Sequence, residues 1–137
     1  MKKIKLKSND MKNLIEEDKI EYNLENRLIN YAILTSEIAE ILPTTKLGNH
    51  LSGQLIRSCT SPALLYGEVQ GAESNRDFIH KMKIILKELR ESKINLLIIK
   101  KKPLLKNNDN LEKSLDETLQ LVAIIAASIK TASKRLK

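Results

Sequence analysis

The side chains of this 137-residue chain that could do chemistry are few, and they form no recognisable catalytic set. Two carboxylate pairs occur at short spacing, Glu68 with Glu73 and Glu88 with Glu91, but solvent-facing helices carry such pairs routinely. The single cysteine, Cys59, has no histidine at a spacing that would activate it as a nucleophile. We therefore expect no catalytic residue.

Motifs for metals and nucleotides are also missing from the sequence. One cysteine and two histidines do not suffice for a four-ligand structural zinc site. The acidic run at residues 112–117 contains no Glu-x-x-His, so the ligands of a di-iron bundle site are lacking. The glycines form neither a P-loop nor a dinucleotide fingerprint. We expect no metal, no cofactor and no enzymatic activity.

The informative chemistry is positive charge, since the chain has a formal net charge of +7. One row of basic residues recurs at steps of four and three, with few acids between its members: Arg76, His80, Lys83, Lys87 and Arg90. Such a row suits the phosphates of a nucleic acid. A single Phe and three Tyr do not provide the aromatic platform on which single-strand binders stack bases. Charge that serves only solubility is the alternative.

This basic row lies on the longest predicted helix, residues 74–102. Ser74 is its expected N-cap, Asp77 stands three residues later, and Pro103 ends the helix. An apolar stripe with the same four-three rhythm occupies the opposite face, and it consists of Phe78, Met82, Ile85, Leu89, Ser92, Leu96 and Ile99. One face of this helix therefore packs against the protein, and the other is basic.

Apolar stripes predict three further helices, at about residues 24–42, 47–70 and 111–136. Pro62 inside the second of these predicts a kink or a break near residues 58–62. Four helices with short connections predict an all-α fold, an antiparallel up-down-up-down four-helix bundle over residues 23–137. Residues 1–22 have no sustained apolar period, so we expect them to form a flexible basic N-terminal arm.

The third and fourth predicted helices carry more apolar residues than one core-facing stripe needs. The surplus predicts a second buried face, most simply a homo-oligomer interface formed by Ile94, Leu97, Ile98, Leu121 and Ile124. No apolar run is long enough to span a bilayer, and no apolar region follows the basic residues 2–7 as it would in a signal peptide. We expect a cytoplasmic protein without membrane contact.

Several short stretches together resemble a known family. They are residues 54–61 (QLIRSCTS), Tyr66, Glu68, residues 70–74 (QGAES), residues 77–81 (DFIHK), residues 87–88 (KE) and residues 90–91 (RE). The chain resembles the bacterial four-helix bundle proteins, some of which are encoded in intervening sequences of large-subunit ribosomal RNA and which were once labelled ribosomal protein S23. The similarity spans roughly residues 25–130, and the part from 71 to 91 is specific.

The resemblance implies an antiparallel four-helix bundle, often a ring-like homopentamer. It also implies kinship with the accessory variability determinant of diversity-generating retroelements, a basic pentameric bundle that binds nucleic acid and a reverse transcriptase. The family at large has no established biochemical activity. This chain departs from the family at Leu65, where relatives usually have Asn, and at Gly67, where they usually have an acid.

Two functions remain open on the sequence. The first is a non-enzymatic, oligomeric basic bundle that binds RNA or another nucleic acid, or that is accessory to a nucleic-acid-handling complex. The second is a protein-interaction scaffold whose charge only keeps it soluble. Residue patterns alone do not separate them.

Overall fold

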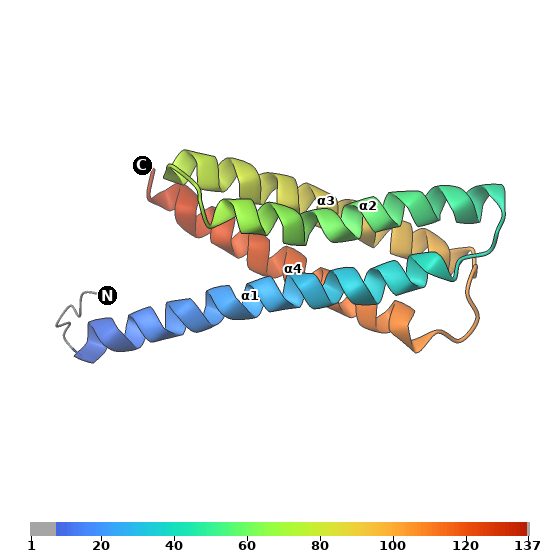
Figure 1. Ribbon diagram of the computed structural model, residues 1–137, viewed down its shortest axis with the longest axis horizontal. Coiled ribbons are helices and arrows are strands. Elements are labelled where there is room, and N and C mark those ends of the chain that lie inside the picture. Colours follow the sequence, from blue (N-terminus) through green and yellow to red (C-terminus); the bar gives the residue numbers. More distant parts are fainter. Residues whose placement is uncertain (1–7, 137) are drawn as a thin grey trace.

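The computed structural model describes the backbone of residues 8–136 and the side chains of residues 23–136. Within these ranges the chain forms four α-helices and no strand (Figure 1). The helices are α1 (Ser8–Glu40), α2 (Lys46–Val69), α3 (Asn75–Lys101) and α4 (Asp109–Lys134). The predicted all-α four-helix bundle is confirmed.

Consecutive helices run in opposite directions. At the beginning of α3, Asn75 donates through Nδ2 to the carbonyl of Ala132, late in α4, over 2.9 Å. At the end of α3, Lys100 pairs with Glu112, early in α4. The colour gradient of Figure 1 likewise reverses from each helix to the next. Short connections at residues 41–45, 70–74 and 102–108 allow this up-down-up-down order.

Three of the helices begin at a side-chain cap. Thr45, Ser74 and Asn108 each accept a hydrogen bond from the backbone N–H three residues further on, at 3.0, 3.1 and 3.1 Å. Each cap satisfies an N–H that the first turn of a helix otherwise leaves without a partner. Before α4 the chain turns at Asn107, whose φ of 46° lies in the left-handed region that Asn tolerates better than most residues. The predicted cap at Ser74 is confirmed.

The connection between α1 and α2 depends on one glycine. A Cβ atom at Gly48 would lie 1.9 Å from the carbonyl oxygen of Pro43. Only a residue without a side chain therefore lets this turn pack directly against the first turn of α2.

Helix α1 begins at Ser8, well before the predicted start at residue 24. The segment 8–22, predicted to be a flexible arm, thus has a helical backbone that continues into the bundle. A helix can extend without an apolar stripe where the residues have adequate helix propensity, and this segment is rich in Glu, Lys and Leu or Ile. Residues 1–7 of the predicted arm lie outside the described residues.

Helix α2 continues through Pro62, so the predicted break does not occur; a kink stays a prediction. The hydroxyl of Thr60 donates to the carbonyl of Ile56 over 2.7 Å, and that of Ser61 donates to the carbonyl of Arg57 over 2.7 Å. These bonds bind the turn before the proline to the backbone of the same helix. The pyrrolidine ring itself is buried.

The core has two apolar halves. The half beside the α2–α3 turn is formed mainly by Leu24, Leu28, Tyr66, Val69, Met82, Ile85, Leu89, Leu121 and Ile125. The half at the opposite end is formed by Ile38, Ala39, Leu42, Leu51, Leu55, Leu96, Ile99, Leu111 and Leu115. Each half takes side chains from all four helices, so neither is complete without the tertiary fold.

Between these halves lies a layer of buried hydroxyl groups, here called the hydroxyl belt. Its members are Tyr31, Thr35, Ser58, Ser92, Ser114 and Thr118, and each is at most 1% exposed. The oxygens of Tyr31 and Thr118 lie 2.7 Å apart, and those of Thr35 and Ser114 also lie 2.7 Å apart. Ser92 donates to Ser58 over 2.8 Å. No buried polar side-chain atom in the described part of the chain lacks a hydrogen-bond partner.

Candidate nucleic-acid interface

The predicted basic row lies on the outward face of α3. Its steps of four and three residues keep all members on one side of the helix. All five side chains are exposed: Arg76, His80, Lys83, Lys87 and Arg90. The bundle thus presents these groups to solvent, as the sequence predicts, while the opposite side of α3 packs into both halves of the core.

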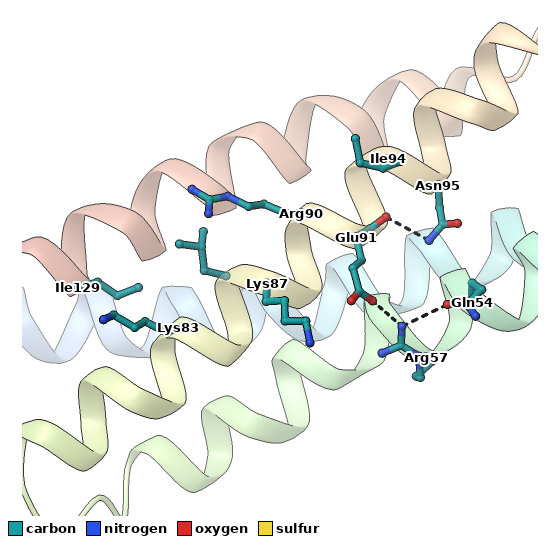
Figure 2. Close-up of a pocket in the computed structure, with 10 residues that line it drawn as sticks. Gln54, Arg57, Lys83, Lys87, Arg90, Glu91, Ile94, Asn95 and Ile129 are labelled. Carbon is teal, nitrogen blue, oxygen red and sulfur yellow. Dashed lines mark hydrogen bonds and ion pairs between the residues drawn. The ribbon is translucent and has the colours of Figure 1, made fainter.

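Three of these cations line one groove on the outer side of α3, with a volume of about 800 Å³ (Figure 2). They are Lys83, Lys87 and Arg90, whereas Arg76 and His80 are not among the residues that line it. The remaining lining residues come from α2, α3 and α4: Gln54, Arg57, Leu86, Glu91, Ile94, Asn95 and Ile129. The floor is thus partly aliphatic, with cations and side-chain amides around it.

Arg57 of α2 connects the groove to two carboxylates of α3. Its Nη1 atom donates to Glu88 over 2.7 Å, and its Nη2 atom pairs with Glu91 and also donates to Gln54 over 3.3 Å. The hydrogen bond that Arg57 donates to Glu91 and the charge of Glu88 raise the pKa of Arg57. The Arg57 side chain is 48% exposed, whereas that of Glu88 is only 11% exposed, so the partly buried carboxylate is neutralised by a cation at the surface.

All three acidic residues of α3 form ion pairs. Asp77 pairs with Lys81 over 3.2 Å and accepts a hydrogen bond from the backbone N–H of Glu73. The hydrogen bond from Lys81 is the main reason that the pKa of Asp77 is lowered. Glu88 and Glu91 are both held by Arg57. No acid of α3 is therefore left to neutralise the basic row.

The three cations of the groove therefore have no acidic partner on α3 and can contact other anions. Among residues 23–136, ion pairs form between Arg27 and Glu117, between Arg57 and its two carboxylates, between Lys81 and Asp77, and between Lys100 and Glu112. None of these pairs includes Lys83, Lys87 or Arg90. Unpaired cations at steps of four and three on a helix can each contact a different phosphate of a polyanion.

The side chains that could take part in chemistry, Cys59, Glu88 and Glu91, are buried or held in ion pairs. Cys59 is fully buried, and this burial raises the pKa of its thiol to about 11, so the nucleophilic thiolate is disfavoured at neutral pH. In the part of the chain that the structure describes, no three His, Cys, Asp or Glu side chains lie together as metal ligands would. Glu88 and Glu91, the candidate carboxylate pair, are both bound to one guanidinium.

The predicted interface residues do not share one environment. Ile94 and Ile98 are 56% and 39% exposed on α3, while Leu97 is half-buried against the core. Ile124 is half-buried and lines a second hollow of about 730 Å³ at the other end of the bundle, together with Val69 and Phe78.

The fifth predicted interface residue, Leu121, is a correction. Its side chain is 0% exposed and belongs to the core of the single chain, so it has no surface to offer a second subunit. A four-three rhythm along α4 leads from Leu111, Leu115 and Thr118 to Val122 and would put Leu121 outside the core stripe, but the structure buries Leu121 and leaves Val122 at the core margin.

Sequence reasoning missed the residues that complete the groove from the neighbouring helices. Arg57, Gln54 and Ile129 are distant in sequence from the basic row and reach it only through the fold. The sequence did contain one signal: Glu88 has no basic residue three or four positions away on its own helix, so a cation that pairs with it is expected from another helix.

Comparison with known proteins supports the fold. No protein-family model matches the sequence, and no curated protein matches it. The structure is similar to the crystal structure of a protein of unknown function from the S23 ribosomal protein family of Bacteroides thetaiotaomicron, with a TM-score of 0.71 and 22% sequence identity. The similarity covers 80% of this chain and 97% of that one. At this identity the likeness establishes the fold alone, and it carries no information on kinship with retroelement proteins.

Within the described part of the chain, no helix combines the length and the apolar character needed to cross a bilayer.

Proposed function

We propose that this protein is a non-enzymatic, oligomeric, basic helical bundle that binds nucleic acid, RNA in particular, through the outer face of α3. One observation carries the proposal: Lys83, Lys87 and Arg90 share a groove and have no carboxylate partner among residues 23–136. These cations would contact phosphates, which are the same at every nucleotide, so binding is expected to be independent of the base sequence.

Oligomerisation would multiply this modest row of cations. In a cyclic assembly each subunit repeats the same groove, and simultaneous phosphate contacts raise avidity without any new residue type. Ile98 on α3 and Ile124 near the α2–α3 turn lie at different places on the bundle, which suits a heterologous contact that closes into a ring. The resemblance favours a pentamer.

The same proposal also states where the protein would act and with which partners. The protein would act in the cytoplasm, alone on RNA or as an accessory to a nucleic-acid-handling complex. The resemblance to retroelement accessory proteins adds a reverse transcriptase as a partner where one is encoded beside this chain.

The test is fluorescence anisotropy with a labelled RNA hairpin at about 50 mM salt, followed by titration with salt. We expect micromolar binding by the wild type and a slope of log affinity against log salt of about −2.7 for each subunit that contacts the RNA through three phosphates. The variant Lys83→Glu/Lys87→Glu/Arg90→Glu should lose binding and stay folded, because these side chains are exposed.

The matched control is Lys101→Glu/Lys102→Glu/Lys106→Glu. It makes the same change in net charge on exposed lysines near the end of α3, outside the groove. Near-normal binding by the control and none by the groove variant would locate the contact. Equal loss in both would show that net charge alone attracts the RNA.

Assembly is tested separately by light scattering at micromolar concentration. Ile98→Asp should dissociate the oligomer while the subunit stays folded, because Ile98 is already 39% exposed in the single chain. A wild type that is a stable monomer would remove the oligomer from the proposal.

The second candidate is a protein-interaction scaffold, and the aliphatic part of the groove favours it. Leu86, Ile94 and Ile129 give the groove an apolar floor that phosphates do not cover. Electrostatic contacts are strong at about 50 mM salt. If the wild type binds no RNA at about that concentration, the protein-interaction scaffold replaces nucleic-acid binding as the proposed function.

A further inference from the structure

We infer that Arg57 is a positioning residue for the basic groove, because it holds Glu91 away from Lys87 and neutralises Glu88. The inference rests on the proposed function and deepens it, since it identifies what keeps the groove cationic. Arg57 belongs to α2, whereas the cations and the carboxylates that it separates all belong to α3.

The spacing on α3 shows what would happen without Arg57. Lys87 and Glu91 stand four residues apart on one helix, which is a spacing at which lysine and glutamate pair on a helix surface. Both side chains line the same groove. In the structure Glu91 is instead bound to Nη2 of Arg57, and no ion pair joins it to Lys87.

The geometry calls for arginine at this position. Nη1 binds Glu88 while Nη2 binds Glu91, so the two nitrogens of one planar guanidinium serve two carboxylates at the same time. The amide oxygen of Gln54 accepts a third hydrogen bond from the guanidinium, donated by Nη2 over 3.3 Å. A lysine ammonium is a single point and could hold only one of the carboxylates well.

The experiment measures RNA binding by Arg57→Gln across a salt titration. Each cation that leaves a phosphate lowers the magnitude of the salt slope by about one. We expect Arg57→Gln to bind several-fold more weakly than the wild type, with the slope reduced by about one for each subunit that contacts the RNA, because Glu91 then pairs with Lys87. The control Lys101→Gln removes one charge from the exposed end of α3, at a residue that forms no ion pair with the described residues, and should leave the slope unchanged.

Rescue separates this role from a structural one and from direct contact. In Arg57→Gln/Glu88→Gln/Glu91→Gln no carboxylate remains to be held, so the slope should return to the wild-type value. Circular dichroism establishes that each variant is folded, and looser packing of α2 would not change the slope of a fully folded protein. Should Arg57→Gln fail to fold, Arg57→Lys and Arg57→Lys/Glu91→Gln provide the same comparison with a cation kept beside Glu88.

The outcomes are distinct. A triple variant that binds as weakly as Arg57→Gln would mean that Arg57 itself contacts phosphate, and the inference would be wrong. Arg57→Gln that behaves like Lys101→Gln would also overturn it, while leaving the proposed function intact if the groove variant still loses binding. A wild type that does not bind RNA would refute the proposed function, and the inference with it.

Discussion

The hydroxyl belt allows a test of how much a buried hydrogen bond contributes to this fold. The oxygens of Thr35 and Ser114 are 2.7 Å apart, and both side chains are 0% exposed. Thr35→Val keeps the shape of the side chain but removes its hydroxyl. The oxygen of Ser114 then faces an apolar methyl in a site that water does not reach.

The magnitude follows from this loss of a partner. A buried hydroxyl left without its hydrogen bond costs about 1–3 kcal/mol, which is more than the net contribution of the bond itself. Thr35→Val and Ser114→Ala should therefore each lower the free energy of unfolding by about 2 kcal/mol. The double variant removes both hydroxyls together, so its loss should be about 2 kcal/mol smaller than the sum of the two single losses.

The assay is urea unfolding followed by circular dichroism at one fixed protein concentration, because subunit association would otherwise change the apparent stability. Ser36→Ala is the control: its hydroxyl donates to the carbonyl of Ile33 in its own helix and is exposed, so we expect a change within about 0.5 kcal/mol. Additive losses in the double variant would refute the reasoning, since they would show that the two hydroxyls do not depend on each other.

Two further predictions concern single positions. Gly48→Ala should lower the free energy of unfolding by about 3 kcal/mol, because the new Cβ would lie 1.9 Å from the carbonyl oxygen of Pro43. A Cβ added at Gly53 or Gly67 would meet nothing within 4 Å. Gly53→Ala and Gly67→Ala should therefore each raise the free energy of unfolding by about 0.5–1 kcal/mol in the same urea assay. Burial raises the folded-state pKa of Cys59 from 9.0 to about 11. The buried thiol therefore makes its full contribution to the free energy of unfolding below pH 9.0, and this contribution is lost as the pH rises towards about 11. The stability advantage of the wild type over Cys59→Ala should shrink by about 2 kcal/mol across that window, and a constant difference would contradict this assignment.

The four helices and their connections were predictable because their signals are local. Apolar stripes, the cap at Ser74 and the proline at 103 each act within a few residues of the chain. The start of α1 was not predictable in this way, because the sequence of residues 8–22 has no sustained apolar period.

The candidate site could be predicted only in part, for the same physical reason. The exposed basic row follows from the periodicity of α3 alone, and its exposure is confirmed. The neutralisation of Glu88 and Glu91 depends on Arg57, which lies 31 and 34 residues earlier in the chain and meets them only when α2 packs against α3. The error at Leu121 arose because Leu121 and Val122, three and four residues after Thr118, are both apolar, so the sequence pattern does not show which of them enters the core.

The hydroxyl belt also restricts the register in which the helices can pair. A helix that slid by one turn would keep an apolar stripe towards its neighbours, because such stripes repeat every three or four residues. The same slip would break the Tyr31–Thr118 and Thr35–Ser114 pairs. In one direction it would bring Thr35 level with Leu111 and Thr118 level with Leu28, which would leave buried oxygens without partners. The two apolar halves thus provide most of the adhesion between helices, whereas the polar layer between them makes the staggered alternatives unfavourable.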